Sequence, residues 1–495
     1  MRDITIKIDP EGAGIFPHKL NPWISKTYPV NDDEIEIIVY AANGHVFSGW
    51  SGDVGQNNTS GIPLRIKDTG EKRVITAHFS PARTDKPRLT IRSDFDNGNV
   101  ILRYIDQVGR IVITEPQQIN DCTNIWWHFT LDGIEPGEAI TIDTNHSPIA
   151  GNCQPVYSYD GFHWARFTGQ KPPYTQIFTE SKVEIARNIP YPYSRAISLT
   201  DELASNNNCN IFSLCKSENG LDVWAFQVTD PETNDKDKKT LWVQARSHAF
   251  ESHSSWVAEG ILRWICGDSE AAAKLREKCQ IFVVPILDVD NVYHGGAGKS
   301  QWNSQNQPAD VNHDWGNEPL WSVTKSITQK LQTLKEDHDF LGFLDLHSPW
   351  FYQGPEFYIN NMDLDLGKAF FSLFSGHIRA RNNPNTWDSC WFVTNSEDQL
   401  MSQDTGFFGG DDNPLPVFRY KLEEPAKFIS STGWVVKEGI IDPANSLAIT
   451  VEIPHWKDDS GEIITKEGLL GFGACLGMAA NDFAELSAQG NHKPK

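Results

Sequence analysis

The stretch "TLWVQARSHAFESHSSWVAEGILRWICG", residues 240–267, decides the fold of the C-terminal part of the chain. A short apolar run is followed by a polar turn and then by a segment whose apolar side chains recur at helical spacing: Val257, Ile261, Leu262 and Ile265. This pattern predicts a strand, then a helix from Ser255 to Cys266 that stops at Gly267.

The same alternation of strands and helices continues towards the C-terminus. The runs "IFVVPILDV" at 281–289 and "FLGFLDLHS" at 340–348 have the composition of buried strands, and a helical pattern lies near 319–335. Such alternation favours a parallel or mixed sheet with helices on both faces, and ligand sites then lie beyond the carboxyl ends of the strands. Residues 223–495 are therefore predicted to form an α/β/α domain with a mixed sheet.

The chain before residue 223 shows no long helical period. Residues 1–85 contain short alternating runs separated by turn residues, which predicts a small all-β unit. Residues 86–222 are expected to form a β-sandwich. The fold class is thus multidomain, because 495 residues exceed one ordinary core.

The N-terminal motif "NGHVFSGWSGD" at 43–53, with "VITAHF" at 74–79, resembles the internalin B-type repeat of bacterial surface proteins. This resemblance implies a bacterial protein that is secreted or located at the cell surface. Trp50 of the motif is expected to fill the core of the small unit, and a sugar-binding platform is the less favoured alternative.

Composition limits the partners. Lys and Arg total 43 against 65 Asp and Glu, a formal charge of -22, which argues against nucleic acid or an anionic membrane as a partner. No apolar run reaches the roughly 18 to 20 residues that cross a bilayer. The eight cysteines contain no CxxC pair, so a cysteine-based zinc site is not expected, and their disulfide state stays open.

Three metal-binding side chains fall at predicted strand ends. His248 follows the strand "LWVQARS" directly, Glu251 comes in the turn before the helix, and His347 ends another strand. A histidine and a carboxylate with two residues between them can bind one ion together with a second, distant histidine, which leaves a fourth position open to water. Each residue alone is more often an ordinary loop residue, but together they predict a metal site.

A hydrolase that uses such a metal also needs a base that is not a ligand. Glu452 lies in "LAITVEIPHW" at 447–456, an otherwise apolar strand pattern where a carboxylate is costly unless it is functional or paired. Glu452 is the predicted general base, and an inward residue satisfied by an arginine is the alternative.

The order of the motifs "ARSHAFESHSSW", "VVPILDVDN", "ADVNHDW", "FLDLHSP" and "ITVEIP" resembles that of the M14 zinc carboxypeptidases, closest to the cytosolic-carboxypeptidase subgroup. The resemblance covers roughly residues 89 to 490. It implies zinc as the cofactor, with Glu452 as general base and acid and Asp310 orienting a ligand histidine. It also implies three zinc ligands: His248, Glu251 and His347. His253 falls where the family has no ligand and is expected to be structural.

The resemblance breaks at the substrate pocket. The family binds the terminal carboxylate of its substrate with an Asn-Arg pair, and here the corresponding pair is Asn312 and His313. From Gln280 to Trp321 there is no arginine, and Lys299 is the only Lys or Arg. Lys299, or an arginine from a distant loop, is a candidate to bind the substrate carboxylate in place of the family's arginine.

Three functions remain open from the sequence. The first is an exopeptidase with a rebuilt carboxylate pocket, and the second is a zinc-dependent esterase or amidase acting on a glycan or a cell-wall polymer. The third is a non-catalytic surface-binding protein, which the presence of Glu452 argues against. The substrate is thus a peptide or an acylated polymer, and an extracellular or cell-surface location is favoured over a cytoplasmic one.

Overall fold

The computed structural model describes the whole chain except residues 1–3, 17–26, 32–33, 38, 43–44, 55–63, 68–70, 82–88, 107–110, 116–124, 145–153, 169–172, 299–309, 317, 349–354, 359–363, 388–389, 394–405, 409–429, 456, 459 and 489–495. The chain divides into two compact units. Unit 1 comprises Met1–Ser93, Val100–Gln117 and Phe129–Ile185; unit 2 comprises Asp94–Asn99, Gln118–His128 and Ala186–Lys495. The main span of unit 2 thus begins ahead of residue 223, and the division into three domains stays a prediction.

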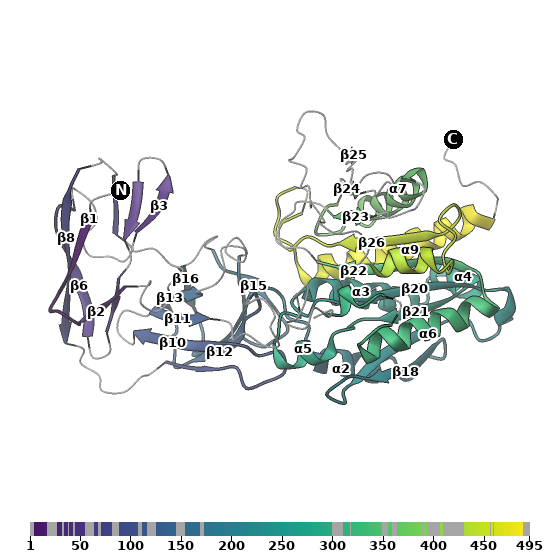
Figure 1. The fold of residues 1–495 in the computed structure, drawn as a ribbon, viewed down its shortest axis with the longest axis horizontal. Coiled ribbons are helices and arrows are strands. Elements are labelled where there is room, and N and C mark those ends of the chain that lie inside the picture. Colours follow the sequence, from purple (N-terminus) through teal and green to yellow (C-terminus); the bar gives the residue numbers. More distant parts are fainter. Residues whose placement is uncertain are drawn as a thin grey trace. The chain divides into compact units, whose positions relative to one another are not determined.

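The N-terminal part of unit 1 is built from short strands, drawn in purple in Figure 1. Its main sheet has the order β1 (Ile4–Asp9), β8 (Arg73–Pro81) and β6 (His45–Gly52). Two smaller sheets pair β2 (Gly14–Ile15) with β5 (Tyr40–Ala41), and β3 (Thr27–Asn31) with β4 (Glu34–Ile37) and β7 (Leu64–Lys67). Trp50 is 5% exposed and packs into the apolar cluster of these strands, so its expected role as a core residue is confirmed.

The rest of unit 1 contains two sheets joined by aromatic rings. The four-stranded sheet has the order β10 (Ile101–Asp106), β11 (Ile111–Glu115), β13 (Glu138–Thr144) and β16 (Tyr174–Phe178). The five-stranded sheet has the order β15 (Ala165–Arg166), β14 (Val156–Ser158), β17 (Lys182–Ala186), β12 (His128–Asp132) and β9 (Thr90–Arg92). The rings of Tyr157 in β14 and Phe178 in β16 lie 5.5 Å apart, so the two sheets contribute to one core.

Unit 2 is organised around a nine-stranded sheet. In order across the sheet its strands are β18 (Cys209–Lys216), β19 (Asp222–Val228), β21 (Cys279–Val284), β20 (Lys239–Ala245), β22 (Phe340–His347), β26 (Leu447–Glu452), β23 (Glu356–Tyr358), β24 (Cys390–Val393) and β25 (Gly406–Phe408). The four central strands β21, β20, β22 and β26 are parallel. Antiparallel pairs flank them on both sides, so the predicted mixed sheet of an α/β domain is confirmed.

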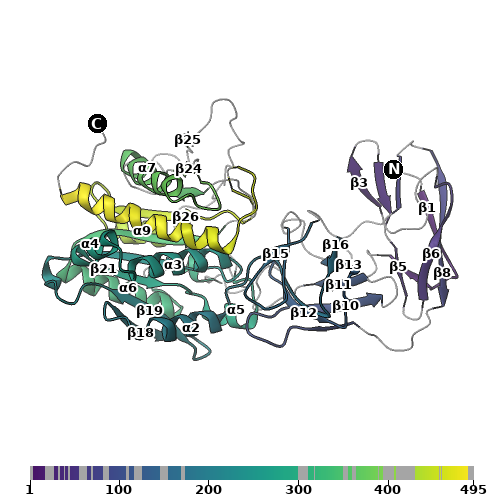
Figure 2. The ribbon, with the colours of Figure 1, turned by 180° about the vertical axis from the view of Figure 1, so that it is seen from behind.

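Unit 2 also contains these helices: α2 (Tyr193–Leu203), α3 (Ser252–Ile265), α4 (Glu270–Lys278), α5 (Val289–His294), α6 (Ser322–Asp337), α7 (Leu364–Ala380), α8 (Ser431–Lys437) and α9 (Lys466–Ala488). Most of them pack on the sheet, whereas α9 packs on α3, α4 and α7. Figure 2 shows α9 running alongside α3. A Cβ on Gly473 of α9 would lie 2.0 Å from the carbonyl oxygen of Val257, so only glycine permits this close approach of the two helices.

Helix α3 begins three residues earlier than the apolar pattern predicts, at Ser252 instead of Ser255. The first turn is polar in sequence, with Ser252, His253 and Ser254, yet all three residues are buried. Apolar periodicity could not mark this start, because the turn is buried with polar side chains, two of which bond to carbonyl oxygens: His253 to that of Pro454 and Ser254 to that of Glu251.

The parallel strands bring three side chains to one edge of the sheet. β20 ends just before the turn that carries His248, β22 ends at His347, and β26 ends at Glu452. Because β20, β22 and β26 are neighbours and parallel, their carboxyl ends lie side by side. This is the edge at which an α/β sheet offers a ligand site.

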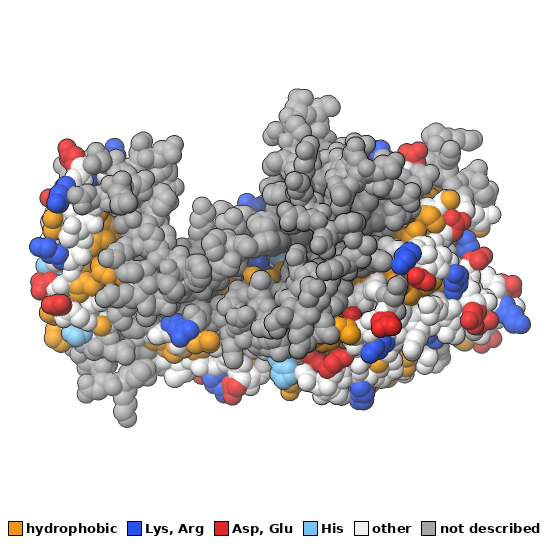
Figure 3. Space-filling view, viewed as in Figure 1, with side chains coloured by type: hydrophobic (Ala, Val, Ile, Leu, Met, Phe, Trp, Pro, Cys, Tyr) orange, Lys and Arg blue, Asp and Glu red, His pale blue; other side chains and the backbone are white. Residues whose placement is uncertain are grey.

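The surface of the described residues carries both signs of charge. On the face drawn in Figure 3, Lys and Arg side chains are interspersed with Asp and Glu. Among the helices that the structure describes, none is both long and apolar enough to cross a membrane.

Candidate metal centre

His248 and Glu251 lie in a buried turn between β20 and α3. Their side chains are 3% and 1% exposed, respectively. His248 Nδ1 lies 2.9 Å from Glu251 Oε1. Glu251 is the residue that immediately precedes helix α3, so its carboxylate is fixed by the start of a long packed helix.

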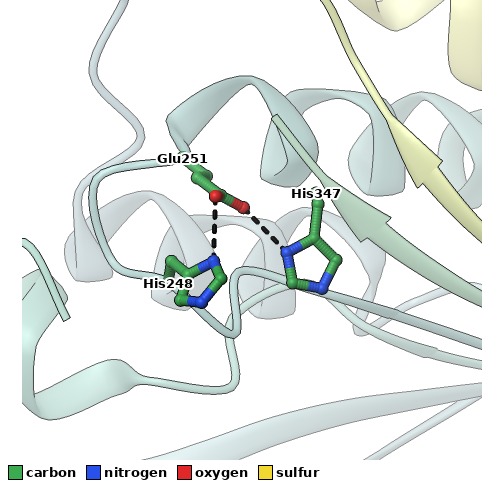
Figure 4. A group of neighbouring side chains, drawn as sticks. All are labelled: His248, Glu251 and His347. Atoms are coloured by element: carbon green, nitrogen blue, oxygen red, sulfur yellow. Dashed lines mark hydrogen bonds and ion pairs between the residues drawn. The ribbon is translucent and has the colours of Figure 1, made fainter. Parts of the chain in front are cut away.

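His347 reaches the same carboxylate from the end of the neighbouring strand. Its Nδ1 lies 3.0 Å from Glu251 Oε2, which also accepts a hydrogen bond of 3.1 Å from the amide of Ser348. Figure 4 shows both imidazole rings facing the carboxylate between them. Each residue of the triad offers one ligand atom, and these atoms all lie within 4.8 Å of one another.

The chemistry of this donor set suits zinc. Two imidazole nitrogens and one carboxylate oxygen are the protein ligands of many catalytic zinc sites, in which the fourth position is left for water or substrate. All three residues are buried, which keeps competing water away from the ligand atoms. The residues present therefore fit a bound Zn²⁺ ion.

The charges within the triad are strongly coupled. Burial favours the neutral form of Glu251, but His248 and His347 outweigh burial and hold the pKa of this carboxyl well below its ordinary value. Burial alone would lower the pKa of His347, but the Asp345 and Glu251 carboxylates outweigh it and raise this pKa well above its ordinary value. The carboxylate is thus ionised and ready to act as a ligand.

Carboxylates also stand behind both histidines. Asp345 Oδ2 lies 3.3 Å from His347 Nε2, and Asp310 Oδ2 lies 3.8 Å from His248 Nε2. Both aspartates are 1% exposed. A carboxylate that accepts a bond from Nε2 orients the imidazole ring and leaves Nδ1 as the ligand atom. Asp345 is close enough for such a bond, whereas the separation of Asp310 is longer than an ordinary hydrogen bond. Asp310 was anticipated from the sequence and Asp345 was missed.

Glu452 lies beside His347 on the adjacent strand. The two residues are direct partners in the parallel pairing of β22 with β26, so their side chains project from the same face of the sheet. Glu452 is half-buried and is not a member of the described metal-binding group. The pairing agrees with the predicted role of Glu452 as general base, which stays a prediction.

His253 is not a member of the described metal-binding group. Its side chain is fully buried, and Nδ1 lies 3.1 Å from the carbonyl oxygen of Pro454. Because a carbonyl only accepts, Nδ1 must carry a proton. This bond ties the first turn of α3 to the segment after β26, and the structural role of His253 stays a prediction.

The residues predicted to bind substrate are described only in part. Asn312 and His313 lie in a short 3-10 helix, Val311–His313, and Asn312 is half-buried. The side chain of His313 and the whole of Lys299 lie outside the described residues.

Two buried arginines near the triad were not anticipated. The guanidinium of Arg187 lies 5.4 Å from the ring centre of Phe250, and this ring stacks on His248 at a centroid distance of 6.3 Å. Arg246 lies two residues before His248, and burial lowers its pKa to about 9. Arg187 comes from a segment about sixty residues away in sequence, so no local sequence pattern predicts that it lies near Phe250.

Comparison with known proteins agrees with this geometry. Residues 197–348 match the sequence model of the peptidase M14 family, described as zinc carboxypeptidase. Cytosolic carboxypeptidase 2 of Xenopus tropicalis is 35% identical over 113 residues, covering 21% of this chain and 12% of that protein. Cytosolic carboxypeptidase 6 of Mus musculus is 22% identical over 326 residues, covering 59% of each protein. The chain therefore matches only part of the length of these relatives.

The fold also matches a solved structure. A metallo-carboxypeptidase from Burkholderia cenocepacia superimposes with a TM-score of 0.62 at 18% identity, over 80% of this chain and 99% of that one. This similarity supports the carboxypeptidase-like α/β fold.

The comparisons correct one prediction. An extracellular or cell-surface location was inferred from the N-terminal repeat motif, but the curated relatives are named cytosolic carboxypeptidases. The motif describes a turn and a strand of a small β-unit, and such a unit carries no information about compartment. A bacterial origin stays a prediction.

Proposed function

Because the chain contains a zinc carboxypeptidase domain of the M14 family, we propose that it is a zinc-dependent hydrolase whose metal is held by His248, Glu251 and His347. The observation that carries this proposal is the buried triad, in which the Nδ1 atoms of His248 and His347 lie 2.9 and 3.0 Å from the two oxygens of one carboxylate. The relatives' name favours a cytosolic peptide as the first substrate class to test.

The protein's own residues supply the acid and base chemistry. When bound, zinc lowers the pKa of a water molecule to ~7 and polarises the substrate carbonyl. Glu452 takes the proton from the attacking water and delivers it to the leaving group as the tetrahedral intermediate collapses. The direct pairing of Glu452 with His347 supports this role, because residues paired on neighbouring parallel strands project from the same face of the sheet.

The substrate pocket is the altered part of the site. A guanidinium holds a carboxylate through two parallel hydrogen bonds and is always charged, whereas a neutral histidine offers one donor. Replacement of the family's arginine by His313 removes about 1.5–3 kcal/mol of binding to a terminal carboxylate. We therefore expect weaker dependence on a free C-terminus than in a conventional exopeptidase.

A second candidate function follows from the same alteration. The absence of arginine from Gln280 to Trp321 favours an esterase or amidase that acts on an acylated polymer, where no terminal carboxylate is bound. A binding protein without catalysis would have no use for Glu452 beside the ligands.

The first experiment measures the metal. Elemental analysis of protein prepared without chelator is expected to give about one zinc per chain, with loss of hydrolysis after dialysis against chelator and recovery on adding zinc. A preparation without zinc that hydrolyses peptides equally well would overturn the proposal.

A second assay separates the two candidate functions. Free peptides, peptides with a blocked C-terminus and acylated sugars are compared at equal concentration. Cleavage that needs a free terminal carboxylate would exclude the esterase or amidase, whereas cleavage that ignores it would exclude the exopeptidase.

A further inference from the structure

Arg246 occupies an unusual backbone position at the start of the ligand turn. It follows the last residue of β20 and has a φ of 67°, in the left-handed region that long side chains rarely adopt. The side chain is completely buried. A strained backbone at a buried arginine persists only where the surrounding contacts fix it.

The guanidinium of Arg246 ties the ligand turn to helix α3. Its Nε donates to the carbonyl oxygen of Ala249 at 2.6 Å, and Ala249 lies between the two ligands of the turn. Its Nη1 lies 3.2 Å from Ser255 Oγ on α3 and 3.2 Å from the carbonyl oxygen of Tyr191. One side chain therefore connects the turn with helix α3 and with the segment that carries Tyr191.

The backbone of Arg246 extends these connections to the third ligand. Its amide donates to the carbonyl oxygen of Leu346 at 3.4 Å, and Leu346 immediately precedes His347. Its carbonyl accepts a bond of 3.2 Å from the amide of Asp288. Arg246 thus contacts both segments that carry the triad.

We propose that Arg246 is a positioning residue for the metal centre, which holds the turn so that His248 and Glu251 meet His347 before the metal arrives. The proposal rests on the zinc site proposed above. Its effect is on metal affinity, since a ligand set that is already assembled loses less conformational freedom when the ion binds.

Two variants test the guanidinium. Arg246→Lys keeps the positive charge but cannot bond Ala249, Tyr191 and Ser255 together, and Arg246→Gly removes the side chain at a φ that glycine adopts without strain. We expect zinc affinity, measured by chelator competition, to fall about tenfold in Arg246→Lys and about 100-fold in Arg246→Gly. The visible absorption spectrum of the cobalt-substituted protein should shift in both.

Arg276 provides a matched control. It is also buried, and its Nη1 donates to the carbonyl oxygens of Ile265 and Gly267, at the end of α3 that lies far from the ligands. Arg276→Lys is expected to lower the unfolding temperature but to keep the zinc affinity and the cobalt spectrum of the wild type. Equal loss of zinc affinity in both lysine variants would mean that Arg246 acts only through the stability of the fold and does not position the metal ligands.

The outcomes separate this inference from the proposed function. If the wild type takes up no zinc, the proposed function fails. If the wild type binds zinc and Arg246→Lys and Arg246→Gly bind it equally well, only the role of Arg246 fails. Should both variants misfold, Ser255→Ala removes one acceptor of the guanidinium, and an unchanged zinc affinity in that variant would refute the inference.

Discussion

The proposed metal-binding half of the site and the proposed substrate-binding half are built in different ways. His248, Glu251 and His347 are buried residues at the ends of two parallel strands and at the start of a helix that packs along α9. Asn312 instead lies half-buried in a three-residue 3-10 helix. The metal half is therefore fixed by the fold, whereas the substrate half can change by substitution without disturbing the sheet.

This difference explains why one half keeps the pattern of the M14 carboxypeptidases and the other departs from it. Each residue of the triad contacts another through the Glu251 carboxylate, so the loss of one would leave buried charge without compensation. Asn312 and His313 lie in a short 3-10 helix outside the strands of the sheet. Substrate preference is thus the property that can vary on this scaffold.

The largest expected effect concerns the base that stands next to the triad. Glu452→Gln should lower kcat by about 10²–10⁴-fold, because the amide cannot accept the proton from water. Zinc content should stay at the wild-type level, since Glu452 is not a member of the metal-binding group. Steady-state kinetics and elemental analysis of the same preparation measure both quantities.

Glu462→Gln is the matched control for this variant, because it makes the same change at an exposed glutamate on the segment after β26. It should leave kcat unchanged. If Glu452→Gln also lost its zinc, the separation between ligands and base would be wrong.

A smaller effect is expected in the substrate half. His313→Arg puts a guanidinium where the family has its arginine, and this group can hold the terminal carboxylate through two parallel hydrogen bonds. The KM for a peptide with a free C-terminus should therefore fall about 10-fold to 150-fold, which corresponds to about 1.5–3 kcal/mol of binding free energy. A peptide with a blocked C-terminus should be unaffected. Kinetics with the two peptides side by side measure the change.

His294→Arg controls for the added charge, because it places the same guanidinium at an exposed histidine of α5. An equal gain in both variants would mean that general attraction, and not a specific clamp, improves binding. No gain in His313→Arg would show that position 313 does not face the substrate carboxylate.

Much of the metal half could be predicted from the sequence, because strand ends in α/β folds are marked by a change from apolar to polar residues. Asp345 was missed although it carries a signal: it lies two residues before His347 on one strand, and thus on the same face. The role of Arg246 had no such signal, since a left-handed conformation is expected at glycine and asparagine, not at arginine. Arg187 reaches Phe250 only through tertiary folding.

The smallest effect distinguishes the two carboxylates behind the triad. Asp345 lies 3.3 Å from His347 Nε2, whereas Asp310 lies 3.8 Å from His248 Nε2, beyond ordinary hydrogen-bonding distance. Asp345→Asn should therefore weaken zinc binding by about tenfold, and Asp310→Asn by less. Chelator competition on both variants and the wild type gives the order. The reverse order would mean that the carboxylate expected from the family resemblance dominates, and that the shorter contact of Asp345 serves β22 instead of the metal centre.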